Sequence, residues 1–172
     1  MFVYLVKKKQ IEKDYKIRKG YNMGFTLSQR SLDRLDGVHE DMVRVVKKAI
    51  DVSKIDFGVI CGLRTIEEQE ALVAKGASQT MKSKHLDGLA VDLMAYIGGR
   101  ASWELNVYDD IADAMKEAAK LENVGIRWGA AWQIDDMRTW DGTMEDAMNA
   151  YVDLRRGQGR RPFIDGPHFE LS

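Results

Sequence analysis

One segment of the sequence combines a histidine, an Asp-Gly pair and a second aspartate within ten residues: Ser83-Lys84-His85-Leu86-Asp87-Gly88-Leu89-Ala90-Val91-Asp92. It places His85 seven residues before Asp92. That spacing suits a loop or strand end, a tight turn at Asp87-Gly88, and a strand that returns from the turn. Such a path can aim an imidazole and a carboxylate at one point, so His85 and Asp92 are candidate ligands of a metal ion.

A second cluster, Asp165-Gly166-Pro167-His168-Phe169-Glu170, lies at the far end of the sequence. Two histidines and one carboxylate, with a fourth position left for water, are the composition of a catalytic zinc site. Zinc in such a site lowers the pKa of its water and polarises a scissile carbonyl. Asp165, three residues before His168, is well placed to take the proton of that water and deliver it to a leaving amine. The spacing alone leaves an alternative open, in which both histidines are ordinary hydrogen-bonded residues near turns.

Apolar periodicity and capping residues predict helices and short strands around these two clusters. For example, Thr65-Ile66-Glu67-Glu68 is a capping box that opens a helix. We expect helices over 28–35, 41–52, 65–76, 102–122 and 143–155, and strands over 57–61, 89–96, 125–129 and 168–171. Helices and strands are mixed without strict alternation or repeats, so the predicted class is α+β.

The composition is that of an ordinary globular protein. The 172 residues are enough for one compact domain with a real core. The net charge of −1 offers no electrostatic case for binding nucleic acid or a membrane surface, and no stretch approaches a membrane span. Cys61 is the single cysteine, which excludes an internal disulfide and a cysteine-cluster metal site. We interpret Cys61 as a buried strand residue.

Residues 1–22 differ from the remainder in charge. They contain only two acidic residues against seven basic ones, Lys7, Lys8, Lys9, Lys13, Lys16, Arg18 and Lys19. Since Met23 reads like a natural start, we expect a basic N-terminal extension at 1–22 with little role in the fold, and a functional domain at 23–172. The apolar run 2–6 is too short for the core of a signal peptide. We therefore expect a protein made in a cytoplasm without an export signal of its own.

Together, Ser83-x-His85-x6-Asp92 and Asp165-x-x-His168 resemble the signature of the LAS metallopeptidases. This family includes D-alanyl-D-alanine carboxypeptidases and dipeptidases and the phage L-alanyl-D-glutamate endolysins. Gly62-Leu63-Arg64-Thr65 looks like an upstream element of the same family. The resemblance runs from about Leu27 to the C-terminus. It implies one compact LAS/hedgehog-like domain in which a small antiparallel sheet is flanked by helices.

The resemblance also implies a role for each matching residue. The implied Zn²⁺ ligands are His85, Asp92 and His168. Asp165 would act as the general base, and Arg64 would bind substrate or stabilise the oxyanion. Without the resemblance, Arg64 would be read as a salt-bridge partner at the end of a strand. Ser83 would help to hold the substrate.

Among members of the family, the phage endolysins look most similar, because Asp rather than Glu precedes the last ligand. We therefore expect a zinc endopeptidase that cuts the L-alanyl-D-glutamate bond of the peptidoglycan stem peptide. It would be a monomer that binds no nucleic acid and does not span a membrane. It would reach the cell wall through a membrane pore or after lysis. Two alternatives stay open: a D-alanyl-D-alanine carboxypeptidase or dipeptidase, and a catalytically inactive zinc-containing module that binds the cell wall.

A few other parts of the sequence also bear on the site, and some of them have two interpretations. Segment 133–164 is longer than expected in compact relatives, and we expect it to border the cleft. Glu170 faces solvent or holds a zinc histidine. His39 is read as a helix-entry residue. Three tryptophans are read as core or cleft wall, with stacking on sugar rings as the alternative: Trp128, Trp132 and Trp140.

Overall fold

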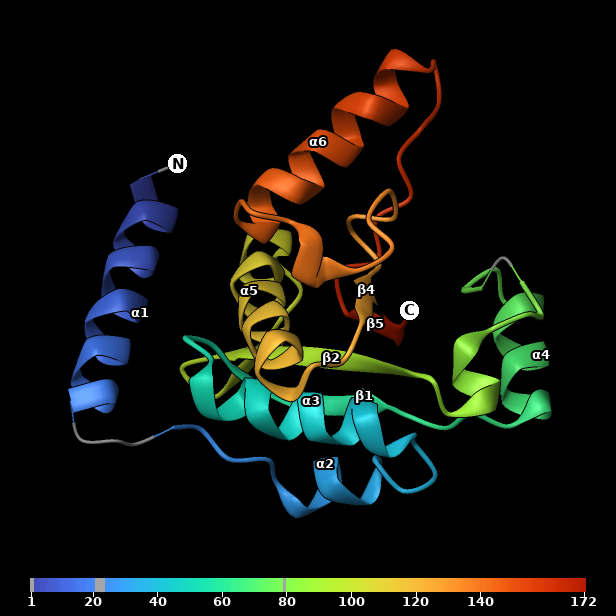
Figure 1. Cartoon of the computed structure of the whole chain (residues 1–172), viewed down its shortest axis with the longest axis horizontal. Helices are drawn as coiled ribbons and strands as arrows, with labels where there is room; N and C mark the ends of the chain where they lie inside the picture. Colours follow the sequence, from blue (N-terminus) through green and yellow to red (C-terminus); the bar gives the residue numbers. More distant parts are fainter. Residues whose placement is uncertain (1, 21–23, 79) are drawn as a thin grey trace.

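The computed structural model describes residues 2–20, 24–78 and 80–172 and shows helices around a small antiparallel sheet (Figure 1). The α-helices are α1 (Phe2–Gly20), α2 (Gln29–Asp33), α3 (Glu40–Val52), α4 (Ile66–Ala74), α5 (Leu105–Glu122) and α6 (Met144–Gly157), and the 3₁₀ helices are η1 (Lys84–Asp87) and η2 (Met137–Thr139). The strands are β1 (Asp56–Cys61), β2 (Ala90–Ile97), β3 (Arg100–Ser102), β4 (Ile126–Trp128) and β5 (His168–Leu171). This arrangement confirms the predicted α+β class.

The sheet brings together the two sequence clusters that contain His85 with Asp92 and Asp165 with His168. Its strand order is β1-β2-β5-β4, all antiparallel, with β3 also paired to β2. In this register Cys61 lies opposite Asp92, and Asp92 lies opposite His168. Directly opposed residues point to the same face of a sheet. One row across three strands therefore carries three side chains with lone pairs on one face.

The other face of the sheet contributes to the core. Val91, Leu93 and Ala95 alternate with Asp92 along β2 and belong to the buried apolar cluster. Helices α3 and α5 pack against each other, and their buried residues join that cluster. These include Met42, Val45, Val46, Ala49, Ile111, Met115 and Ala118. Asp92 therefore projects from a strand whose opposite face is fixed by packing.

Side-chain caps begin several helices where the sequence predicts. Thr65 accepts a hydrogen bond from the Glu68 N–H, and the Glu68 carboxylate accepts one from the Thr65 N–H, which completes the capping box of α4. Thr143 makes the same arrangement with Asp146 at α6. His39 caps α3 by accepting a hydrogen bond from the Asp41 N–H at 3.2 Å. The interpretation of His39 as a helix-entry residue is confirmed.

One local prediction was wrong: helix α5 begins at Leu105, later than the predicted Ser102, because Ser102 is in β3 and pairs with Ala95. The predicted tight turn at Asp87-Gly88 is present and ends the helix η1 before strand β2. Gly88 takes a left-handed conformation there, with φ of 66°, which glycine adopts without the steric penalty of a side chain.

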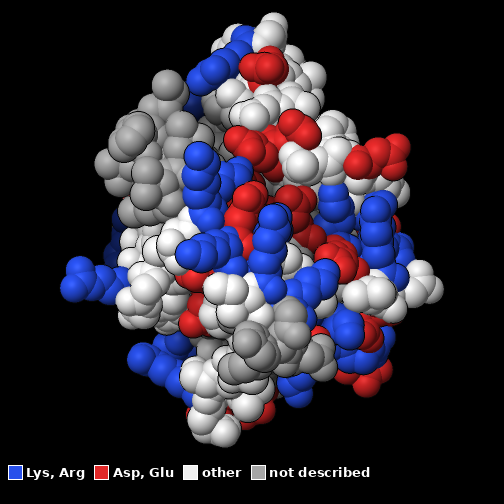
Figure 2. All heavy atoms as spheres, turned by 90° about the vertical axis from the view of Figure 1, so that its left-hand side faces the viewer, with Lys and Arg blue, Asp and Glu red and all other residues white. Residues whose placement is uncertain are grey.

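Helix α1 is connected to the rest of the molecule by packing and by charge. Ile11 packs against the buried core, and Lys8 pairs with Glu145 of α6 at 3.8 Å. Figure 2, viewed from the α1 side, shows acidic side chains in the middle of this face, bordered by lysine and arginine. Exposed pairs of this kind contribute little stability each. The boundary between an extension at 1–22 and a domain at 23–172 stays a prediction. Within the described residues, no helix is both long and apolar enough to cross a membrane.

Candidate metal centre and active site

His85, Asp92 and His168 form a closed triangle of nitrogen and oxygen atoms. His85 Nε2 lies 3.1 Å from Asp92 Oδ1 and 3.2 Å from His168 Nδ1, and His168 Nδ1 lies 3.1 Å from Asp92 Oδ1. In a tetrahedral zinc site with bonds of about 2.0–2.1 Å, neighbouring ligand atoms lie about 3.3 Å apart. The three predicted ligands therefore have the spacing that zinc requires.

Hydrogen bonds behind each imidazole decide which nitrogen faces the triangle. His85 Nδ1 lies 2.8 Å from the Gly62 carbonyl oxygen, and a carbonyl can only accept, so Nδ1 carries the proton. His168 Nε2 lies 3.1 Å from Glu170 Oε2, and the carboxylate likewise accepts from it. With these protons in place, His85 Nε2 and His168 Nδ1 each present a lone pair to the triangle. Such outer hydrogen bonds are usual behind histidine ligands of metals.

Glu170 is buried, with 7% of its surface exposed, and also pairs with Arg127 at 3.2 Å. The solvent-facing interpretation of Glu170 is therefore wrong. Alternation along β5 would have placed Glu170 on the same face as His168, two residues earlier. That signal was present in the sequence, but it did not show which element covers this face.

Without a metal the triangle binds protons tightly. Burial lowers the pKa of both imidazoles, but hydrogen bonds to Asp92 outweigh it and raise the pKa of His85 to about 10 and that of His168 to about 9. Burial raises the pKa of Asp92, yet its hydrogen bonds to the two histidines bring it well below its ordinary value. The Asp92 carboxylate thus favours positive charge beside it. A divalent cation would take the place of these protons.

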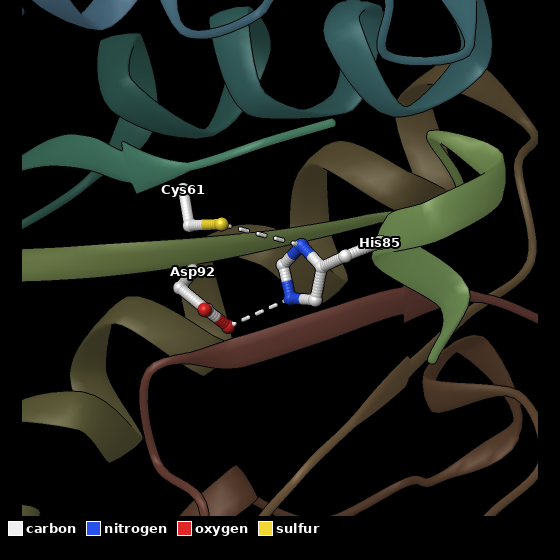
Figure 3. A group of neighbouring side chains, drawn as sticks. All are labelled: Cys61, His85 and Asp92. Carbon is white, nitrogen blue, oxygen red and sulfur yellow. Dashed lines mark hydrogen bonds and ion pairs between the residues drawn. The ribbon is translucent and has the colours of Figure 1, made fainter. Parts of the chain in front are cut away.

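Cys61 lies on the other side of His85 (Figure 3). Together with His85 and Asp92 it forms a group whose possible ligand atoms lie within 4.8 Å of one another. The Cys61 sulfur, however, lies 3.7 Å from His85 Nδ1, the nitrogen bonded to Gly62. Burial raises the pKa of the thiol, but the contact with His85 brings it below its ordinary value. Cys61 is a partly buried strand residue, and nothing in the sequence indicated that it lies beside His85 and Asp92.

Arg64 lies beside the triangle and is held from several sides. Its Nη2 atom lies 3.3 Å from Asp92 Oδ2 and 3.3 Å from the Cys61 sulfur. Its Nη1 atom donates to Gln69 Oε1 at 2.7 Å. Its backbone N–H donates to the His85 carbonyl at 3.0 Å, which connects the Arg64 and His85 segments directly.

Gln69 is a buried residue that the sequence interpretation missed. None of its surface is exposed. While its oxygen accepts from Arg64, its Nε2 atom donates to Ser78 Oγ at 2.8 Å and to the Thr80 carbonyl at 2.6 Å. Gln69 thereby connects the guanidinium to the segment that leads into η1. The available signal was a polar residue on the inward side of α4, which helical spacing from the Thr65 cap would have located.

Asp165 lies on the same cleft as the triangle. Burial and the negative charge of Asp92 raise its pKa, against the opposing effect of His168, His85 and Arg64. The structure records no side-chain hydrogen bond to this carboxyl from the residues it describes. The group is therefore close enough to the triangle to sense its charges and free to accept a proton.

The cleft has a volume of about 580 Å³ and includes every residue that the sequence predicts for the site. They are Arg64, Ser83, His85, Asp92, Asp165 and His168. Phe163 also lines it, which confirms that segment 133–164 borders the cleft. Trp132 is part of the cleft wall, whereas Trp128 is fully buried.

This fold, with two histidines and a carboxylate converging beside an aspartate and an arginine, is that of the LAS class of peptidases. A family model described as phage L-alanyl-D-glutamate peptidase matches residues 23–172, and the chain belongs to this family. The L-alanyl-D-glutamate peptidase of Escherichia phage T5 is 31% identical over 154 residues, covering 87% of this chain and 99% of that protein.

Two further comparisons agree. The L-alanyl-D-glutamate peptidase of Listeria phage A118 is 33% identical over 106 residues, which cover 60% of this chain and 37% of that longer protein. The crystal structure of the Serratia marcescens L-Ala D-Glu endopeptidase ChiX is similar, with a TM-score of 0.64 and 34% identity. It covers 88% of this chain and 91% of ChiX.

Proposed function

We propose that this protein is a zinc-dependent endopeptidase that hydrolyses the L-alanyl-D-glutamate bond of the peptidoglycan stem peptide. The observation that carries the proposal is the triangle of His85, Asp92 and His168, whose ligand atoms lie 3.1–3.2 Å apart in a cleft that Asp165 also lines. The names of the relatives from Escherichia phage T5, Listeria phage A118 and Serratia marcescens support the choice of bond.

Zinc suits this donor set better than the harder or softer alternatives. Two imidazole nitrogens and one carboxylate are ligands that zinc accepts, whereas magnesium and calcium prefer oxygen ligands alone. When bound by His85, Asp92 and His168, zinc would polarise the scissile carbonyl and lower the pKa of an attacking water. Cys61 would stay outside this set, because it faces the protonated nitrogen of His85.

The remaining steps depend on residues of the chain itself. Asp165 would take a proton from the attacking water and pass it to the nitrogen of the leaving D-glutamate. A raised pKa suits a group that must both accept and donate near neutral pH. Arg64 would pair with the free α-carboxylate of D-glutamate, which lies beside the scissile amide, and Ser83 would help to hold the peptide.

The zinc assignment is tested by metal analysis of the purified protein and three variants. We expect one zinc per chain in the wild type, and loss of zinc and of lytic activity in His85→Ala and His168→Ala. Asp165→Asn should keep its zinc and lose activity, because a base is not a ligand. Normal zinc content in both histidine variants would refute the ligand set.

The alternatives from the sequence give different products. A D-alanyl-D-alanine carboxypeptidase or dipeptidase would release D-alanine or its dipeptide, and a wall-binding module would release nothing. Retention of Asp165 in the cleft favours an active enzyme over a module that has lost catalysis. We also infer that the protein acts as a monomer on the cell wall after release through a membrane pore or by lysis. Sedimentation equilibrium of the purified chain tests the oligomeric state.

A further inference from the structure

The cleft is lined by side chains of two chemical kinds. One group is cationic or carries a hydroxyl, namely Arg64, Lys82, Lys84 and Ser83. The structure records no ion pair of Lys82 or Lys84 with any residue that it describes. Lys84 nonetheless acts on the site, since its charge contributes to lowering the pKa of Glu170, against the larger opposing effect of burial.

The second group is aromatic and includes Trp132 and Phe163. Phe163 stacks on Trp132 with ring centroids 6.3 Å apart, and Trp132 lies against the His168 ring at 5.7 Å. Trp132 is supported from behind by the Arg127 guanidinium, 5.6 Å from its ring. Phe163 itself is 48% exposed on the cleft. The stacking gives this exposed ring a fixed orientation.

Trp103 brings a further aromatic ring to the cleft from another part of the chain. It follows β3, which pairs with β2 at Ala95 and runs back toward Asp92. It is 65% exposed, more than any other large apolar side chain among the described residues. One exposed apolar side chain needs no explanation, but exposed apolar surface gathered at a cleft is typical of a ligand-binding groove. Two exposed rings at one cleft therefore indicate a ligand with apolar faces.

The proposed substrate has the same division between charged and uncharged parts. On the D-glutamate side of the scissile bond it carries free carboxylates, which suit the cationic side chains of the cleft. On the L-alanine side it has no charge, and there the peptide is joined through a lactoyl group to a muramic acid ring. The C–H faces of a sugar ring pack well on aromatic faces, which are apolar over the ring.

We propose that Trp103 and Phe163 form a binding site for the muramoyl sugar attached to the L-alanine of the substrate. The inference depends on the proposed function, and it adds that the enzyme recognises the glycan as well as the peptide. Neither residue contacts the reacting atoms in this account. Both determine which substrates bind productively.

The test compares two substrates that share the same scissile bond. One is a disaccharide tetrapeptide, and the other is the same tetrapeptide with only a lactoyl group on L-alanine. We expect the wild type to prefer the sugar-bearing substrate in kcat/KM by about tenfold or more, mainly through KM, as for a contact remote from the chemistry. Trp103→Ala and Phe163→Ala should lose this preference and cleave the lactoyl peptide within about twofold of the wild-type rate.

The matched control is Leu121→Ala, because Leu121 is 58% exposed on α5 and does not line the cleft. It should keep the wild-type preference. Equal cleavage of the two substrates by the wild type would overturn the sugar site and leave the proposed function intact. An equal loss on both substrates in the aromatic variants would also overturn it, since those residues would then contact the peptide or support the fold. Failure to cut the L-alanyl-D-glutamate bond of either substrate would instead refute the proposed function.

Discussion

Replacing Glu170 with glutamine should weaken zinc binding through His168. The Glu170 carboxylate accepts two hydrogen bonds, from His168 Nε2 at 3.1 Å and from Arg127 Nη1 at 3.2 Å. A glutamine amide has one oxygen and one N–H₂ group, so it can accept from only one of these donors. If its N–H₂ group faces His168, the imidazole proton moves to Nδ1, the atom that faces the triangle.

The size of the effect follows from the burial of this pair. His168 and Glu170 are 9% and 7% exposed, so water cannot readily replace the lost hydrogen bond. Changes to such outer partners typically reduce metal affinity about 10- to 100-fold, or about 1.4–2.7 kcal/mol. Competition of the metal-free protein with a chromophoric chelator measures the zinc affinity directly.

Glu117→Gln is the matched control, because this substitution removes the same charge at an exposed position of α5. Its zinc affinity should equal that of the wild type. If Glu170→Gln also binds zinc as tightly as the wild type, while its circular dichroism and melting temperature are unchanged, the tautomer argument for His168 is wrong.

Three further predictions concern the proposed general base Asp165, the buried residue Asp109 and the N-terminal extension at 1–22. Asp165→Asn should bind zinc normally but lose about 10²–10⁴-fold in the rate of muropeptide cleavage; loss of zinc would show that Asp165 is a ligand. Burial and the neighbouring charge of Asp110 raise the pKa of Asp109 to about 7, and its Oδ2 has no hydrogen-bond partner among the described residues. Its contribution to stability is therefore present below its unfolded pKa and is lost as the pH rises through 7. At pH 8, Asp109→Asn should accordingly stabilise the protein relative to the wild type by up to about 4 kcal/mol, because each unit of pKa shift corresponds to about 1.4 kcal/mol. At pH 4 the substitution should change the free energy of unfolding very little. Equal effects of the substitution in urea titrations at both pH values would contradict this. A chain beginning at Met23 should fold and keep its activity on cell-wall preparations, and loss of either would show that residues 1–22 support the domain.

The local elements of the fold were predictable where one short interaction decides them. Thr65 with Glu68 and Thr143 with Asp146 are capping boxes within four residues, so the sequence alone locates both helix starts. Strand β3 was missed because three residues carry too little pattern, and its pairing with β2 depends on the turn at Gly98-Gly99.

The candidate metal ligands could be selected from the sequence as a set, but their geometry could not. Spacing and family resemblance select His85, Asp92 and His168 without showing how they meet. The sheet register, in which Asp92 lies opposite both Cys61 and His168, is a long-range property that no local pattern encodes. Gln69 also has no recognisable motif, because its place in the site depends on hydrogen bonds to Arg64, Ser78 and Thr80 that the folded loop brings within reach.

The central claim is that the cleft cuts one particular bond by zinc chemistry, and the products of digestion test it most directly. Purified peptidoglycan should be digested with the zinc-loaded protein and, in parallel, with the same protein after chelation. Mass spectrometry should then show peptides with new D-glutamate N-termini, and glycan strands whose muramic acid residues carry only L-alanine, in the zinc-loaded sample alone. Release of D-alanine or of the D-alanyl-D-alanine dipeptide, with the L-alanyl-D-glutamate bond intact, would contradict the account.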